Sequence, residues 1–345
     1  DLALLNWSLL WGLVAIGVVL VQSTVWTSAV AAKFDKSRGF AMAVVLSGTP
    51  ITAMVCPVLA TWLIADYGWR AGFAGPGMFC LLVAFGILLL LRDRPETMGL
   101  PPVADWRNDH PAGTDRAVPA ADPRRDQLRA LRMPAMWVLG LASACMYVSR
   151  YAINSWGMLY LQEHRNYTLV EAGLMLGLNT GAGLAGCVVY GFISDRFFNA
   201  RRPPVTFIFG VLEVIALLMI FYTPPGHPVV LSAAFILFGF TLSGLLAVLG
   251  GLFAVDIAGR RAAGAAMGFI GIVSYLGNAL QEWVSGLLIQ RGVTFATVTA
   301  LNEQGQAVAT QVKHYDFRSA IAFWIGASVL SLVLAASLWR VKTHE

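Results

Sequence analysis

Long apolar runs alternate with short polar segments along nearly the whole chain. About 20 apolar residues are enough to cross the hydrocarbon core of a bilayer as an α-helix, and about nine runs approach or exceed that length. The pattern therefore predicts an all-α polytopic membrane protein. The predicted spans lie near residues 8–32, 38–64, 71–92, 135–161, 168–192, 203–222, 229–255, 264–290 and 317–340.

Lysine and arginine fall mainly on every second connection between these spans. One set of alternate connections holds 18 of them, and the opposite set holds five. Cytoplasmic loops of membrane proteins carry the excess of Lys and Arg. We therefore expect a cytoplasmic C-terminus, and we interpret the net charge of +5 as a mark of orientation and not of a nucleic-acid interface.

Residues 93–134 form the largest polar segment, which is rich in Pro, Arg and Asp. Such a composition is typical of a linker between domains. We expect a cytoplasmic interdomain loop here. It would join the remainder of an N-terminal helical bundle (1–92) to a C-terminal six-helix bundle (135–345).

An internal repeat supports this division. The segment "KFDKSRGFAMA" (33–43) resembles "VDIAGRRAAGAAMG" (255–268), because in each an acid precedes basic residues and a helix start rich in small residues. Superposing the two aligns the span near 229 with the span near 8, and it leaves the spans within 135–222 without counterparts. We therefore expect two related six-helix bundles, with about the first three helices absent from this chain.

Composition and motifs argue against several functions. Residues are 57% hydrophobic and only 12% charged, against about 25% charged in soluble proteins. The four cysteines lie in apolar runs without paired spacing, and the five histidines lie in connections or the tail, so neither a metal site nor a cofactor is expected. The sequence has no Walker motif and no nucleophile elbow. We therefore expect neither an enzyme nor an ATP-driven pump.

One charged residue lies deep inside a predicted span. Arg150 is about 15 residues into the run at 135–161, hence about 22 Å along a helix, and a charge at such depth costs about 2.5–3.5 kcal/mol on insertion scales. It could be a structural group paired with an acid or with backbone carbonyls. The alternative, which we favour, is an anion-binding group in a water-filled cavity. A guanidinium suits phosphate because its planar fork offers two parallel donors and its charge does not vary with pH.

Polar residues at helical spacing surround Arg150 or share a face elsewhere. Tyr147, Tyr151 and Asn154 form a polar wedge beside it. A second stripe runs down the span near 264–290, and it would line a cavity or form hydrogen bonds between helices. This stripe contains Tyr275, Asn278, Glu282 and Ser285, with Ser274 and Gln281 at its edge.

These patterns give the candidate site residues. For substrate binding they are Arg150, Tyr147, Tyr151, Asn154, Asn278, Gln281 and Thr180. Glu282 is the candidate coupling group, because it could pair with Arg150 in one conformation or bind a proton. Asp195 and Arg196 could form a gating cluster, or they could only set topology. The glycines around Thr180 (177, 181, 183 and 186) predict close helix packing and not a phosphate loop.

Several segments resemble a known family. "GFISDRFFNARRPP" (191–204) resembles the loop signature of the major facilitator superfamily. Three more are similar to its organophosphate:phosphate antiporter branch, which includes glycerol-phosphate and hexose-phosphate transporters and a hexose-phosphate sensor. They are "LRDRPETMGLPPVADWRND" (91–109), "YVSRYAINSWGMLYLQE" (147–163) and "RAAGAAMGFIGIVSYLG" (261–277).

The resemblance implies a protein of the bacterial inner membrane that works by alternating access. It would exchange a small organic anion, a phosphate ester, for inorganic phosphate across the lipid bilayer. Arg150 stands where the branch has a phosphate-binding arginine on its seventh helix. The sequence departs from the branch at "VVLSGTPIT" (44–52), which lacks the usual Trp-Asn and His-Asn pattern, and near Thr180, where a glutamate is common.

Two other functions remain open at this point. The same scaffold could be a phosphate-ester sensor that signals through a partner kinase. It could also be a proton-coupled carboxylate symporter, which the loss of the pattern at 44–52 and the presence of Glu282 would favour.

Overall fold

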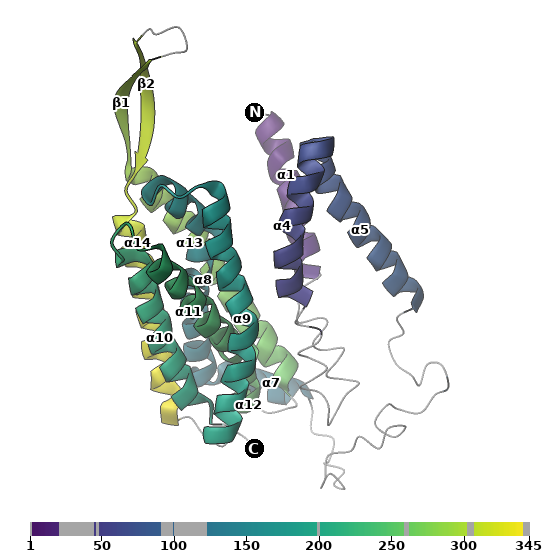
Figure 1. Ribbon diagram of the computed structural model, residues 1–345. Coiled ribbons are helices and arrows are strands. Elements are labelled where there is room, and N and C mark those ends of the chain that lie inside the picture. Colours follow the sequence, from purple (N-terminus) through teal and green to yellow (C-terminus); the bar gives the residue numbers. More distant parts are fainter. Residues whose placement is uncertain are drawn as a thin grey trace. The chain divides into compact units, whose positions relative to one another are not determined.

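The structure is a computed structural model that describes residues 2–20, 45, 48–90, 99, 123–198, 201–258, 262–301 and 307–340. The chain divides into two compact units, Asp1–Ala120 and Ala121–Glu345. Figure 1 shows the elements of both units. Each unit is considered separately below.

The first unit contains three described helices, α1 (Leu2–Leu20), α4 (Gly48–Tyr67) and α5 (Trp69–Leu90). Helix α4 packs against α5. Gly68 joins these two helices with a φ of 83°, a left-handed conformation that glycine adopts without steric cost. Its N–H donates to the carbonyl of Ile64 at 3.0 Å, so the turn also satisfies the end of α4.

The second unit is a bundle of long helices (Figure 1). It begins with the short helix α7 (Pro123–Arg132), and it also contains one two-stranded antiparallel sheet. The long elements are α8 (Pro134–Leu159, continued by the π-helical turn Tyr160–His164), α9 (Leu169–Phe197), α10 (Arg202–Tyr222), α11 (Pro228–Ala247), α13 (Ala263–Arg291) and α14 (Arg318–Ser337). A π-helical segment (Val248–Leu252) and α12 (Phe253–Ala258) extend α11, and Leu338–Arg340 forms a final 3₁₀ turn.

Local sequence explains where several of these helices begin. Helices α8, α10 and α11 each have proline in the first turn, where its missing N–H removes no helical hydrogen bond. Helix α9 starts with a capping box, in which the Thr168 side chain accepts from the Glu171 N–H and the Glu171 carboxylate accepts from the Thr168 N–H.

The end of α10 is held by an arginine from the connection between α8 and α9. Arg165 donates to the carbonyls of Thr223 (2.6 Å), Ile220 (3.1 Å) and Phe221 (3.0 Å). Its Nε also donates to the Tyr160 hydroxyl at 2.9 Å. A cation at a helix C-terminus satisfies carbonyls that lack a partner and opposes the helix dipole.

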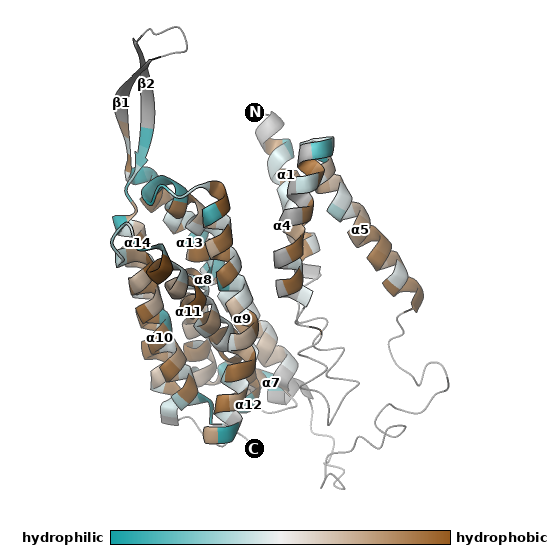
Figure 2. Ribbon diagram, viewed as in Figure 1, coloured by the Kyte–Doolittle hydropathy of each residue, from teal (hydrophilic) through white to brown (hydrophobic). Residues whose placement is uncertain are grey.

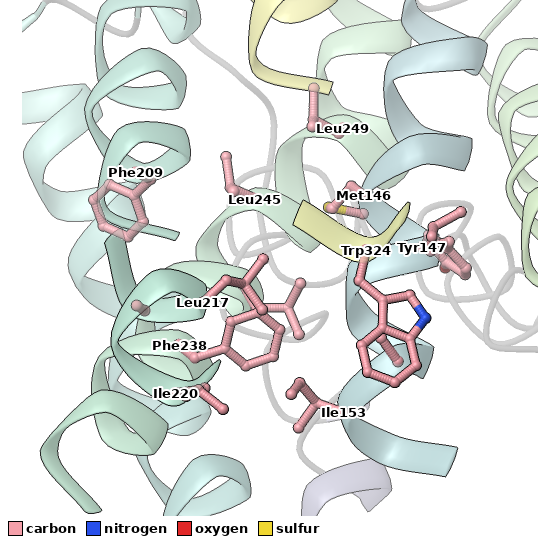
Figure 3. Close-up of a cluster of buried hydrophobic side chains, with 14 of the residues drawn as sticks. Met146, Tyr147, Ile153, Phe209, Leu217, Ile220, Phe238, Leu245, Leu249 and Trp324 are labelled. Atoms are coloured by element: carbon pink, nitrogen blue, oxygen red, sulfur yellow. The ribbon is translucent and has the colours of Figure 1, made fainter. Parts of the chain in front are cut away.

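Apolar side chains from most of the helices meet inside this unit. Figure 3 shows Met146 and Ile153 of α8 near Trp324 of α14, with Leu217 of α10 and Phe238 of α11 in the same cluster. Each of these five side chains is buried. In Figure 2 the helices of this unit are mostly brown and white along their lengths, and teal residues gather at their ends and in the connections.

Helices α9 and α11 approach closely at glycines. A Cβ added to Gly186 would collide with the carbonyl oxygen of Phe240, and one added to Gly239 would collide with the carbonyl oxygen of Asn179. The predicted role of the α9 glycines is therefore confirmed at Gly186. At Gly181 a Cβ would meet no atom within 4 Å.

The helical membrane architecture expected from hydropathy is confirmed. Each predicted span overlaps a helix of the described residues. Residues 21–32, 38–44, 46, 47, 91 and 92 of the predicted spans lie outside the described residues. Within the described part of the chain, six helices are long and apolar enough to cross a membrane. They are Trp69–Leu90, Pro134–His164, Leu169–Ser194, Arg202–Tyr222, Pro228–Ala258 and Arg318–Ser337. Helix α13, which carries the predicted polar stripe, is not among them.

Two features were not part of the sequence prediction. A β-hairpin, β1 (Val293–Leu301) paired antiparallel with β2 (Ala307–Tyr315), connects α13 to α14. Its first strand reads "VTFATVTAL", which is rich in the β-branched residues that favour strands. Helix α7 lies in the segment 93–134 that was predicted to be a linker, and most of that segment is outside the described residues. The domain boundaries at 92 and 134 stay a prediction.

Candidate functional site

Arg150 lies against aromatic rings in the second unit. Its guanidinium carbon is 5.2 Å from the ring centroid of Tyr147 and 5.2 Å from that of Tyr151. The Tyr147 ring also packs edge-on against Tyr275 of α13, with 5.6 Å between centroids. Cations stack favourably on aromatic faces, most strongly where water is excluded. The structure thus brings Arg150, two of its predicted partners and the first residue of the polar stripe together.

No carboxylate of the described residues forms an ion pair with Arg150. The side chain is partly buried, and Asn154, one helical turn further along α8, is exposed. This argues against the structural interpretation in which Arg150 is neutralised by an acid. A cation that is oriented by rings and has no acidic partner can still bind an anion.

Glu282 of α13 is held by two donors from α8. Its Oε1 accepts from the Ser155 hydroxyl at 2.5 Å, and its Oε2 accepts from the Trp156 indole N–H at 3.0 Å. Glu282 is partly buried and Ser155 is exposed. The carboxylate is therefore fixed against the same helix that carries Arg150, but it is not paired with Arg150 in this structure.

The other predicted residues of the α13 stripe divide into two groups. Asn278 is partly buried, and its Oδ1 is a buried oxygen with no hydrogen-bond partner. Gln281 is completely buried and donates to Ser285 at 3.2 Å, which also accepts from the Trp324 indole of α14 at 2.8 Å. Gln281 thus lies on the side of α13 that packs against α14.

Thr180 makes its hydrogen bond within its own helix. Its hydroxyl donates to the Leu176 carbonyl at 3.1 Å, which is a common arrangement for threonine in apolar helices. The neighbouring Asn179 is buried, and its Oδ1 has no partner. No described contact joins Thr180 to the Arg150 cluster.

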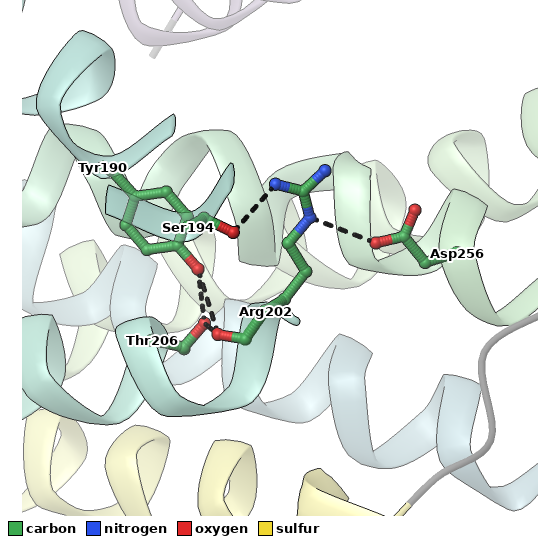
Figure 4. A network of polar contacts seen from close by, with 5 residues as sticks. All are labelled: Tyr190, Ser194, Arg202, Thr206 and Asp256. Carbon is green, nitrogen blue, oxygen red and sulfur yellow. Dashed lines mark hydrogen bonds and ion pairs between the residues drawn. The ribbon is translucent and has the colours of Figure 1, made fainter. Parts of the chain in front are cut away.

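The ion pair at this end of the bundle involves Arg202 and Asp256, and not the predicted gating residues Asp195 and Arg196. Arg196 is exposed, and the side chain of Asp195 is outside the described residues. Instead, Arg202 Nε lies 3.3 Å from Asp256 Oδ2, and Arg202 Nη1 donates to the Ser194 hydroxyl at 3.2 Å, so α9, α10 and α12 are joined. Figure 4 shows this network.

The Arg202 network also includes Tyr190 and Thr206. The Tyr190 hydroxyl lies 2.8 Å from Thr206 Oγ1 and donates to the Arg202 carbonyl at 3.2 Å (Figure 4). Arg202 and Asp256 are in segments that the sequence singled out, but their 54-residue separation gave no signal that they pair.

The sequence also did not predict a hydrogen bond to a second acidic residue, which is buried. Glu213 of α10 is 1% exposed, and it accepts a hydrogen bond from Ser149 of α8 at 2.6 Å. Ser149 directly precedes Arg150. An acidic residue in an apolar run was visible in the sequence, but its partner was not.

Comparison with known proteins agrees with these observations. Residues 2–281 match the family described as Major Facilitator Superfamily. The chain belongs to the Major Facilitator Superfamily. With its candidate spans, this makes it a multi-pass protein of the inner membrane.

Several relatives support membership of the organophosphate:phosphate antiporter branch of this superfamily. The chain is 34% identical to "Membrane sensor protein UhpC" of Salmonella typhimurium over 66% of its own length and 52% of the relative's. It is 30% identical to "Glycerol-3-phosphate transporter" of Bacillus subtilis over 69% and 54%. It is also 30% identical to "Probable hexose phosphate transport protein" of Chlamydia trachomatis over 70% and 55%. The chain thus spans about half the length of these relatives.

Solved structures agree on the fold alone. The chain matches a bacterial homologue of the iron transporter ferroportin in its outward-facing state with a TM-score of 0.54 at 16% identity. The match covers 93% of this chain and 65% of that one.

Proposed function

We propose that the protein containing this chain is a secondary active transporter of an organic anion. It exchanges a phosphate ester for inorganic phosphate by alternating access. The single observation that carries this proposal is Arg150, a permanent cation within a membrane helix, stacked on two tyrosines and without a carboxylate partner among the described residues.

Phosphate fits this arrangement for physical reasons. The guanidinium edge presents N–H donors in a planar fork that matches two phosphate oxygens. The rings of Tyr147 and Tyr151 restrict the Arg150 side chain, so less conformational entropy is lost when an anion binds. The charge of arginine also persists at every physiological pH.

The other candidate site residues have different roles in the proposal. Tyr147 and Tyr151 orient Arg150, and Asn154 and Asn278 offer amide groups to the bound ester. Gln281 and Thr180 act through helix packing, because the contacts described for them lie within α9 or toward α14. Glu282 couples α13 to α8 through Ser155 and Trp156. Asp195 and Arg196 contribute to gating near the end of α9.

The relatives support phosphate esters as substrates. Two of them are named as transporters of glycerol-3-phosphate and hexose phosphate. The proposal includes a cytoplasmic C-terminus, as the distribution of Lys and Arg predicts.

A second candidate function is a sensor of phosphate esters. The observation that favours it is the 34% identity to a membrane sensor protein. In that case the site would bind the same ligand, and a partner kinase would receive the signal. Transport separates the two candidates, because a sensor needs binding but not exchange.

The experiment uses the full-length protein in proteoliposomes loaded with labelled inorganic phosphate. External glycerol 3-phosphate or glucose 6-phosphate should drive efflux of label, and Arg150→Ala should abolish it. Ester binding that depends on Arg150 without efflux would support the sensor. Uptake of a carboxylate that does not depend on internal phosphate and that collapses with an uncoupler would support a proton-coupled carboxylate symporter and contradict the exchange.

A further inference from the structure

Glu282 and Arg150 are opposite charges on neighbouring helices that do not neutralise each other. Both donors to Glu282, Ser155 and Trp156, are neutral groups. Within the described residues, no Lys, Arg or His forms an ion pair with Glu282. Neutral donors satisfy part of a carboxylate's hydrogen-bonding capacity, but they supply no positive charge to balance it.

A further acceptor lies one helical turn before Glu282. Asn278 Oδ1 is buried and has no partner in the described structure. Residues four apart lie on the same face of a helix, so this oxygen and the Glu282 carboxylate are neighbours on α13. A buried acceptor without a donor costs free energy. The pair is thus an acceptor-lined region that lacks a cationic donor.

The separation between this region and Arg150 limits what can bridge them. Ser155, which binds Glu282, follows Arg150 by five residues on α8, hence by about 7.5 Å along the helix axis. An offset of this size along the axis favours an elongated ligand over inorganic phosphate. The body of a six-carbon phosphate ester is long enough to span it, with the phosphate on Arg150 and the other end toward Glu282.

We propose that Glu282 and Asn278 form a specificity subsite that selects phosphate esters carrying an ammonium group, such as phosphorylated amino sugars. The phosphate occupies Arg150, and the ammonium donates to the Glu282 carboxylate and to Asn278 Oδ1. This inference rests on the proposed function, because it requires the phosphate to bind at Arg150. It adds that the opposite end of the substrate is chosen by charge.

An ammonium suits the subsite better than a hydroxyl does. A hydroxyl supplies one neutral donor, while an ammonium supplies up to three donors and the missing positive charge. Both groups can donate to the carboxylate, but only the ammonium adds an ion pair and further donors, so the expected preference is about tenfold.

The test compares two probes with the same carbon skeleton, glucosamine 6-phosphate and glucose 6-phosphate. Each probe displaces labelled inorganic phosphate from the purified full-length protein, so the measurement serves a transporter and a sensor equally. Glucosamine 6-phosphate should compete about tenfold more strongly in the wild type. Glu282→Gln should bring the ratio close to one. The exposed Glu163 gives the matched control Glu163→Gln, which should keep the ratio.

Each outcome bears on a different claim. Phosphate binding with equal competition by the two esters, or a ratio that Glu282→Gln does not change, would overturn the subsite and leave the proposed function standing. Wild-type protein that binds no phosphate would overturn both. Should Glu282→Gln fail to fold, Glu282→Asp and Ser155→Ala keep the charge and should keep the preference, and loss of the preference in both would overturn the subsite.

Discussion

Ser149 of α8 donates a hydrogen bond to Glu213 of α10, with 2.6 Å between Oγ and Oε1, directly before Arg150 in the chain. Both side chains are almost completely buried. The bond thus joins the backbone that carries Arg150 to a neighbouring helix, at a place where no water replaces a lost partner.

Removing this acceptor should destabilise the bundle. Glu213→Ala removes the bond between the two helices, leaves the Ser149 hydroxyl with only the Met146 carbonyl of its own helix at 2.9 Å, and opens a cavity. We therefore expect the free energy of unfolding to fall by about 1–3 kcal/mol. Glu213→Gln keeps an acceptor oxygen of the same shape and should lose less. Thermal unfolding in detergent measures both. Equal stability of Glu213→Ala and the wild type would show that the bond contributes nothing.

Phosphate binding should require an arginine at position 150, and not only a positive charge there. Arg150→Ala removes charge-assisted hydrogen bonds that contribute about 1.5–3 kcal/mol, so affinity for inorganic phosphate should fall by more than about tenfold. Arg150→Lys keeps the charge but loses the planar fork, and it should give an intermediate affinity. Calorimetry on the purified protein measures this. The exposed Arg291 provides the control Arg291→Ala, which should bind as the wild type does.

Arg165 should stabilise the end of α10. Its guanidinium donates to three carbonyls there, and Arg165→Ala leaves them without a donor. We expect the free energy of unfolding to fall by about 1–3 kcal/mol. The exposed Arg318 offers a matched comparison. If Arg318→Ala lowered the melting temperature as much as Arg165→Ala did, the effect would be one of net charge and not of capping.

The contact between α9 and α11 should reject even a methyl group at Gly186. In Gly186→Ala the new Cβ would meet the Phe240 backbone, which cannot move as a flexible side chain does, so we expect a loss of about 1–3 kcal/mol. Gly181 lies on the same helix with open space around it. Gly181→Ala should therefore be neutral or slightly stabilising, because alanine favours the helix. Thermal unfolding of the two variants measures this difference, and equal melting temperatures would contradict the prediction.

The sequence alone determined where the membrane helices lie and which charged residues interrupt their apolar character. Hydropathy acts over about 20 adjacent residues, so the runs that became α8 to α14 were visible without any tertiary information. The cost of Arg150 within such a run was also a local property, and it identified the candidate site. The close packing at Gly186 was also predicted from the sequence, because glycines recur along that run.

Only the tertiary structure decided how the polar side chains pair. Ser149 and Glu213 are 64 residues apart, and Ser155 and Glu282 are 127 apart. Such pairs depend on how each helix is rotated about its axis and on which helices are neighbours, and neither follows from the period of one segment. Gln281 and Glu282 illustrate this, since adjacent residues on a helix point about 100° apart. That rotation directs Gln281 toward Ser285 and Trp324 and Glu282 toward α8.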